Sequence, residues 1–180
     1  MSKSWLPGDP RPTGRIARMI RVDHAGEVGA TRIYAGQLAV MGKSMLGSTI
    51  RHMADQEAKH KAAFDRLMVE RRVRPTLLAP FWHVAGYALG AATALMGPRA
   101  AMACTVAIET EIDRHYGRQL VELGDGDPAL VEAIDEFRAD EAEHREIALA
   151  AGAERAPGYP LLSRAIRFGC RAAIALSRRI

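Results

Sequence analysis

The sequence predicts an all-α protein built on a four-helix bundle, and three observations support this prediction. First, 48% of the 180 residues are hydrophobic and 26% are charged, which is typical of a folded globular chain and argues against intrinsic disorder. Second, aromatic residues make up only 6%, while Ala, Leu, Met, Arg and Glu are abundant, which favours helices over a β-sandwich. Third, four long stretches show helical periodicity, and strand-like alternation is nowhere sustained.

The four predicted helices are bounded by residues that commonly begin or end helices. Gly42 and Gly47 bracket the first turn, and Pro98 is suited to begin the third helix. Ahead of the fourth helix, Asp127 and Pro128 supply an N-cap and a first-turn proline. The expected helices cover residues 15–41, 45–72, 99–123 and 128–152.

Two further segments do not follow the bundle pattern. Residues 76–97 contain no Asp, Glu, Lys or Arg, and we expect them to form a long apolar crossover between the second and third helices. Residues 159–180 place apolar side chains on one side and arginines largely on another, which predicts a basic amphipathic helix at the C-terminus. With residues 1–14 as a flexible N-terminus, we expect a single domain over residues 1–180.

Charge is distributed unevenly along the chain. The net charge of +4 combines +7 over residues 1–75 and +5 over residues 157–180 with −8 over residues 98–156. The basic excess accompanies apolar sequence and lacks the stacking aromatics of a nucleic-acid-binding element, so we expect an anionic membrane surface as partner and no nucleic acid. Two cysteines without a CxxC pair give no disulfide framework and no zinc finger.

Polar residues interrupt the apolar stripe of every predicted helix. Each helix contributes a glutamate, and the second and fourth helices add a histidine three residues later, where side chains are neighbours. Buried unpaired carboxylates cost on the order of several kcal/mol, so four together require a cation. Carboxylates with imidazoles suit iron or manganese, and the set matches the dinuclear sites of ferritin-like bundles. The residues are Glu27, Glu57, His60, Glu109, Glu141 and His144.

Other polar residues are open to two interpretations. Tyr116 lies two turns after Glu109, where it either packs in the core or orients a metal ligand and relays protons. Asp23 and Asp113 either orient metal-bound histidines or are ordinary polar groups. Four further glutamates are expected on solvent-exposed faces: Glu111, Glu136, Glu143 and Glu146.

Four segments of the chain resemble the demethoxyubiquinone hydroxylases of ubiquinone biosynthesis. These segments are VDHAGEVGATRIYAGQLAV at 22–40, EAKH at 57–60, AMACTVAIETEIDRHY at 101–116 and DEAEH at 140–144. The resemblance runs from Arg15 to the C-terminus. The long first segment makes it far more specific than two Glu-x-x-His pairs alone.

The resemblance implies a ferritin-like monooxygenase that uses two iron ions and O₂ to hydroxylate the ring of a demethoxyubiquinone or its quinol. The six residues above correspond to the family's iron ligands without departure, and carboxylates of Glu57, Glu141 or Glu109 would bridge the irons. The targeting extension of the mitochondrial members is missing, so we expect a bacterial protein. Other ubiquinone-biosynthesis proteins and a second copy of the chain are further partners to be considered.

Segment 76–97 would be about 33 Å long as a helix, enough to cross a bilayer. Crossing would separate the first two helices from the last two, although the metal site needs all four together. We therefore expect a crossover whose outer face contacts lipid or, alternatively, a second copy of the chain. Basic residues favour lipid and peripheral attachment to the cytoplasmic face of a bacterial cell membrane. These are Arg71, Arg72 and Arg74, together with Arg164, Arg167, Arg171 and Arg178 in the tail.

Two other functions fit the sequence less well. Iron storage or peroxide detoxification on the same bundle would not need the uncharged crossover or the basic tail. A non-enzymatic membrane adaptor would bind no stoichiometric iron. We therefore expect an enzyme, an O₂-dependent hydroxylase whose substrate is a hydrophobic quinone.

Overall fold

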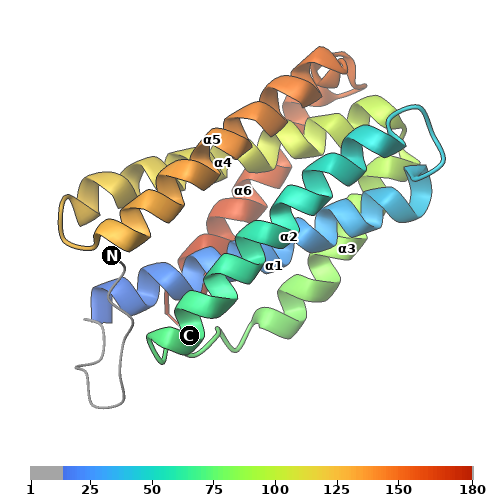
Figure 1. Ribbon diagram of the computed structural model, residues 1–180. Helices are drawn as coiled ribbons and strands as arrows, with labels where there is room; N and C mark the ends of the chain where they lie inside the picture. The colour runs from blue at the N-terminus through green and yellow to red at the C-terminus, as the bar shows by residue number, and fades with distance from the viewer. Residues whose placement is uncertain (1–13, 180) are drawn as a thin grey trace.

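The computed structural model describes residues 14–179, which are helical with short connections and contain no strand (Figure 1). The all-α fold expected from the sequence is confirmed. Residues 1–13 of the expected flexible N-terminus lie outside the described residues, and Gly14 already begins a helix. The elements are α1 (Gly14–Met41), α2 (Gly47–Glu70), α3 (Ala79–Leu95), α4 (Pro98–Leu123), α5 (Pro128–Ala150), the 3₁₀ turn η1 (Ala153–Arg155) and α6 (Tyr159–Ser177).

The bundle consists of two antiparallel hairpins, α1 with α2 and α4 with α5 (Figure 1). Helices α2 and α4 run in the same direction, so the chain must return along the whole bundle between them. Helix α3 makes this return, so it is the apolar crossover that was expected between the second and third bundle helices. None of the helices in residues 14–179 is long and apolar enough to cross a membrane.

Helix α3 lies against α1 in backbone contact. A Cβ atom added to Gly90 would overlap the carbonyl group of Ile33, and one added to Gly36 would overlap the carbonyl group of Tyr87. Glycine is therefore required at both positions, because only a residue without a side chain permits this approach. The close contact at these two glycines holds the crossover helix α3 against α1.

Helix α6 packs against α4 and also contacts α1. Its Arg167 donates to Glu111 Oε1 at 2.6 Å, and Arg171 lies 3.7 Å from the same oxygen. The prediction that Glu111 is solvent-exposed is therefore wrong: the residue is 2% exposed because α6 packs over it. Trp82 Nε1 of α3 donates to Ser177 Oγ at 3.0 Å, which joins the end of α6 to the crossover.

The start of α5 is fixed by the predicted cap and by an unpredicted ion pair. Asp127 Oδ1 accepts a hydrogen bond from the Leu130 N–H at 3.2 Å, and Pro128 occupies the first turn. Arg71, at the end of α2, donates to both carboxylate oxygens of Asp127. Because Arg71 is only 5% exposed, it is not available for a membrane surface as the sequence suggested, whereas Arg72 and Arg74 are exposed.

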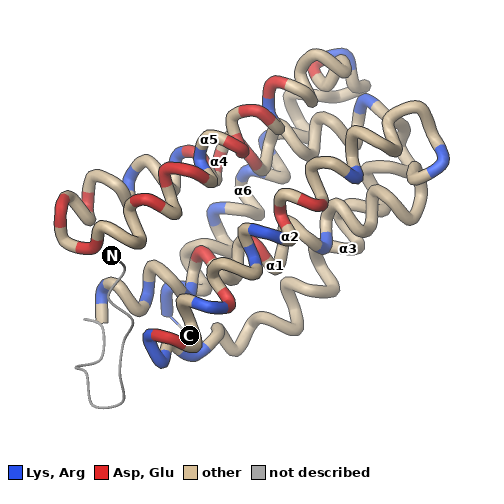
Figure 2. The backbone as a smooth tube through the Cα atoms, in the orientation of Figure 1, with Lys and Arg blue, Asp and Glu red and all other residues tan. Residues whose placement is uncertain are grey.

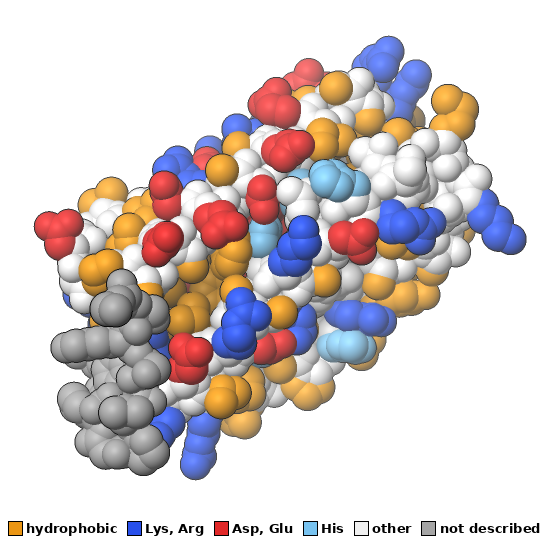
Figure 3. Space-filling model, viewed as in Figure 1, with side chains coloured by type: hydrophobic (Ala, Val, Ile, Leu, Met, Phe, Trp, Pro, Cys, Tyr) orange, Lys and Arg blue, Asp and Glu red, His pale blue; other side chains and the backbone are white. Residues whose placement is uncertain are grey.

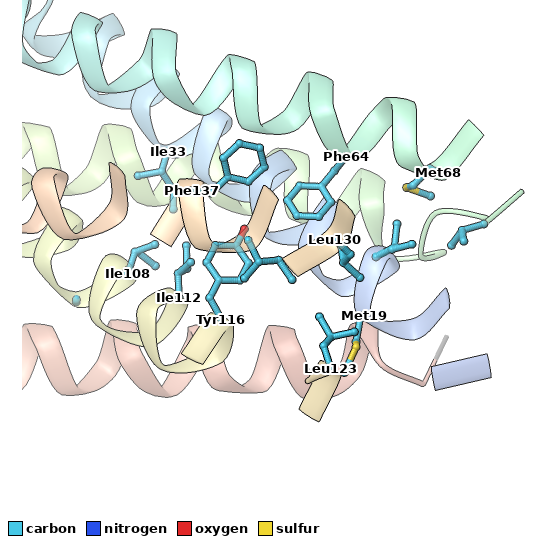
Figure 4. Packing of buried hydrophobic residues seen from close by; sticks show 14 of the residues in the cluster. Met19, Ile33, Phe64, Met68, Ile108, Ile112, Tyr116, Leu123, Leu130 and Phe137 are labelled. Carbon is cyan, nitrogen blue, oxygen red and sulfur yellow. The ribbon is translucent and has the colours of Figure 1, made fainter. Parts of the chain in front are cut away.

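The hydrophobic core forms two clusters, one toward each end of the bundle. One cluster includes Phe64 of α2 and Phe137 of α5, whose rings pack edge to face with their centroids 5.6 Å apart (Figure 4). The other includes Met53 of α2 and Ala148 of α5. Along α2 and α5, the Glu-x-x-His residues lie between members of the two clusters, so apolar packing encloses them on both sides.

The uneven distribution of charge along the sequence appears in the structure as a difference in charge between the two hairpins. Figure 2 shows acidic residues concentrated along α4 and α5, while α3 carries no charged residue. In the view of Figure 3, acidic side chains gather over α5, whereas acidic and basic side chains are mixed over the neighbouring hairpin. The crossover is thus a neutral strip on an otherwise charged molecule.

Candidate metal centre

All six predicted ligands converge at the centre of the bundle, and each is at most 1% exposed. Two groups of four have candidate ligand atoms within 4.8 Å of one another. Glu57 and Glu141 belong to both groups. Glu27 and His60 complete one group, called here the His60 subsite, and Glu109 and His144 complete the other, called the His144 subsite. Four carboxylates and two imidazoles are therefore placed to hold two neighbouring ions.

The unpaired atoms of these side chains support a fit to metal. Buried polar atoms normally have partners, because an unpaired buried group costs about 1–3 kcal/mol. Eight atoms of the six residues are buried and accept or donate no hydrogen bond: Glu27 Oε2, both Glu57 oxygens, His60 Nδ1, Glu109 Oε2, both Glu141 oxygens and His144 Nδ1. A divalent ion in each subsite would give these atoms partners.

Electrostatics at the centre also call for positive charge. Burial and neighbouring carboxylates raise the pKa of Glu27 and of Glu109 well above the usual range, and burial raises the pKa of Glu57. Burial acts to raise the pKa of Glu141 as well, but close contacts with both histidines outweigh it and lower this pKa to about 2. Burial acts to lower the pKa of His144, yet its carboxylate neighbours raise that pKa to about 9.

Each histidine is oriented by a side chain that sequence reasoning missed. Asp140 lies 2.9 Å from His60 Nε2, and Gln56 lies 3.0 Å from His144 Nε2. With a proton on Nε2 in both rings, Nδ1 faces the carboxylates, and its lone pair is available to a metal ion that displaces any proton held there. Their positions in the sequence could have indicated this role, because Gln56 and Asp140 each immediately precede the glutamate of a Glu-x-x-His motif.

Two tyrosines hold the remaining carboxylates. Tyr116 Oη donates to Glu27 at 2.5 Å, so Tyr116 contacts a predicted ligand directly. Tyr34 Oη donates to Glu109 at 2.8 Å, so it holds a second predicted ligand in the same way. Burial raises the pKa of both tyrosines well above the usual range, so each remains a hydrogen-bond donor.

Asp23 and Asp113 do not contact the histidines of the centre. Asp23 is buried and accepts from His115 at 3.0 Å and from Gln119 at 2.8 Å. Asp113 is partly exposed and accepts from Arg138 at 2.7 Å. Of the two interpretations, orientation of the centre's histidines therefore fails for both residues.

An apolar cavity of about 510 Å³ reaches the centre from between α1, α3, α4 and α6. Glu27 and Tyr116 form part of its wall, whereas Glu109 and His144 do not. Asp23 and His115 lie on the same wall, and the remaining lining is almost entirely apolar. The centre therefore opens toward the cavity on the side of the His60 subsite.

Known proteins are similar in sequence to this chain over most of its length. Residues 14–177 match the family described as "Ubiquinone biosynthesis protein COQ7". A 3-demethoxyubiquinol 3-hydroxylase of Rhodospirillum rubrum is 56% identical over 176 residues, covering 97% of this chain and 83% of the relative. The human mitochondrial NADPH-dependent 3-demethoxyubiquinone 3-hydroxylase is 52% identical over 169 residues, covering 92% of this chain and 78% of the relative.

Proposed function

Because this chain belongs to the family of ubiquinone biosynthesis protein COQ7, we propose that it is the hydroxylase that adds an oxygen atom to the ring of a demethoxyubiquinone or its quinol. The family resemblance seen in the sequence is confirmed, and the close relatives are named as hydroxylases. This membership favours an enzyme over a storage protein or a non-enzymatic adaptor.

The observation that carries the proposal is the meeting of the carboxylate–histidine centre with the apolar cavity. A cavity of about 510 Å³ falls within the usual range of roughly 300–1,000 Å³ for sites that bind small organic ligands. Its apolar walls suit a quinone ring and the first part of a polyprenyl tail. Glu27 and Tyr116 lie on the wall, so a ring bound there would reach the centre at the His60 subsite.

The metal we assign to the centre is iron, one ion in each subsite. Carboxylates with imidazoles are suitable ligands for Fe(II), and Glu57 and Glu141, which belong to both subsites, would each be placed to hold both ions. Glu109 belongs to one group only and is assigned to a single iron. When bound, iron supplies the activation of O₂, which no protein side chain carries out.

The side chains of the chain itself position the reacting groups. Tyr116 donates a hydrogen bond from its hydroxyl group to Glu27 and keeps that carboxyl group at the cavity wall. Asp140 and Gln56 keep both imidazoles in the tautomer that presents Nδ1. The apolar wall excludes water, which strengthens every electrostatic interaction at the centre.

We also propose that the α3 side of the molecule rests on an anionic membrane, at the cytoplasmic face of a bacterial cell membrane. Exposed apolar side chains there include Phe81 and Val84 of α3 and Phe168 of α6. Arg164 and Arg178 are exposed and suited to lipid headgroups, whereas the pairs of Arg167 and Arg171 with Glu111 hold α6 on α4. The cavity between α1, α3, α4 and α6 would then receive the quinone from lipid.

Product analysis tests the function. Expression of this chain in cells that lack their own demethoxyubiquinone hydroxylase should convert the accumulated demethoxyubiquinone to the next biosynthetic product. Purified protein should hold about two irons per chain, and Glu141→Ala should lower both iron content and conversion. Glu143→Gln, an exposed neighbour on α5, is the matched control. Unchanged demethoxyubiquinone with normal protein levels would rule out the proposed activity.

Vesicle sedimentation tests the membrane proposal separately. The double variant Phe81→Ser with Val84→Ser should reduce binding to vesicles of phosphatidylglycerol and phosphatidylcholine, because these apolar side chains would leave the lipid. Iron content should not change, since neither residue lies near the centre. Full binding by this variant and by Arg164→Glu would show that the α3 side does not contact the membrane.

A further inference from the structure

The two hairpins contribute to the centre in a nearly symmetric way. Glu27 and Glu109 are 82 residues apart in the sequence, as are Tyr34 and Tyr116. The two Glu-x-x-His motifs are 84 residues apart. Each tyrosine donates to the glutamate on the other hairpin's first helix, so the symmetry extends to the hydrogen bonds.

The symmetry fails at one equivalent pair of positions. Position 140 carries an aspartate and position 56, 84 residues earlier, carries a glutamine. Their distances to the histidine Nε2 atoms are nearly equal, 2.9 Å for Asp140 and 3.0 Å for Gln56. The subsites therefore differ in the charge of the group behind the ring and not in the length of the hydrogen bond.

This difference in charge alters the histidine as a ligand. A carboxylate that accepts the Nε2 proton increases the electron density of the imidazole, whereas a neutral amide does so much less. His60 is therefore the stronger donor through Nδ1. Asp140 also brings a negative charge close to the His60 subsite, and its ion-pair partner in residues 14–179 is His60 itself. Both effects favour a cation in that subsite.

We propose that Asp140 makes the His60 subsite the tighter of the two, so that divalent ions fill the centre in a fixed order. The first ion enters the His60 subsite, on the side of the cavity wall, and the second enters the His144 subsite. Asp140 and Gln56 act as positioning residues, since each contacts a histidine and neither contacts the cavity. The inference rests on the proposed metal centre and deepens it.

A titration with Co(II) tests the strength of each subsite. Chelator-treated full-length protein should bind two ions with well-separated dissociation constants. Asp140→Asn should weaken the first ion about 10–100-fold, the usual effect of losing such a contact, and bring the two constants together. Gln56→Glu should instead tighten the second ion. Glu143→Gln on the exposed face of α5 is the control and should leave both constants unchanged.

The combined variant Asp140→Asn with Gln56→Glu moves the carboxylate from one subsite to the other at constant net charge. With one equivalent of Co(II), anomalous scattering from crystals should place the ion in the His60 subsite of the wild type and in the His144 subsite of this variant. Equal occupancy in the wild type, or the same order in both proteins, would overturn the inference while leaving the centre intact. Failure of the wild type to bind any Co(II) would overturn the metal centre itself. Far-UV circular dichroism confirms that each variant is folded, and Gln56→Glu alone carries the test if Asp140→Asn does not fold.

Discussion

Removal of metal from the centre should make the protein less stable as the pH rises from about 7 to about 9. In the metal-free fold, His144 has its pKa raised to about 9 by its carboxylate neighbours, from a usual value of 6.5. The carboxyls of Glu27 and Glu109 have pKa values raised well above the usual range by burial and by neighbouring charge. All three groups therefore bind protons more tightly in the folded chain than in the unfolded chain.

The sign and size of the effect follow from this difference in bound protons. The stabilisation from His144 is fully present below pH 6.5 and is lost as the pH rises through about 9, which amounts to about 3 kcal/mol. A carboxyl group that stays protonated in the folded chain but is ionised in the unfolded chain lowers the free energy of unfolding by about 1.4 kcal/mol for every pH unit, until the pH reaches its raised pKa. The histidine with the opposite shift, His24, has a lowered pKa and affects stability only at lower pH.

Urea unfolding of chelator-treated protein, followed by circular dichroism at several pH values, measures this loss. Glu109→Gln keeps an acceptor for the Tyr34 hydroxyl but removes one ionisable group, so the metal-free variant should lose less stability between about pH 7 and 9. Glu143→Gln, on an exposed position, should follow the wild type. Protein reloaded with metal should show a much flatter dependence, because the ion replaces the protons.

Two results would refute this reasoning. Metal-free wild type that is equally stable at about pH 7 and pH 9 would mean that the folded chain holds no excess protons. A steeper loss in Glu109→Gln than in the wild type would mean that the carboxylate stabilises the metal-free fold.

Three further substitutions test other parts of the structure. Gly90→Ala should lower the free energy of unfolding by about 1–3 kcal/mol by forcing α3 from α1, whereas Gly169→Ala, which has open space around it, should be neutral or slightly stabilising in the same urea experiment. Arg71→Met should cost about 3 kcal/mol by leaving Asp127 without its partner, and metal stoichiometry should stay at the wild-type value. Tyr34→Phe should weaken Co(II) binding about tenfold or more because the carboxylate that it holds becomes free to move, and an unchanged dissociation constant would contradict this role.

The bundle and the convergence of the six side chains were predictable because both depend on periodicity along single helices. Glu57 and His60 lie on the stripe that also holds Met53 and Phe64, so burial of the stripe necessarily buries them. The helix boundaries marked by glycine and proline were also predictable, because these residues begin or end a helix through the conformation of their own backbone. Asp127 caps α5 as its position next to Pro128 indicates.

Contacts between helices distant in sequence could not be predicted in this way. Asp140 lies off the stripe of α5, and only the packing of α2 beside α5 brings it to His60. Glu111 lies two residues from Glu109 on the opposite side of α4, where a four-helix bundle alone would leave it in water. Helix α6 covers that side, and its arginines pair with the carboxylate that would otherwise be buried alone.

The division of the ligands between the two hairpins has a consequence for synthesis in the cell. Each hairpin supplies two glutamates and one histidine, and the last of these, His144, lies in the final helix of the bundle. A ribosome that has released only α1 and α2 therefore exposes three of the four ligands of the His60 subsite but only one of the four ligands of the His144 subsite. Glu141 of α5 is the ligand that both subsites still lack at that stage. Both subsites are thus complete only after α5 has left the exit tunnel, and a nascent chain stalled before residue 141 should hold at most one ion, more weakly than the finished protein does.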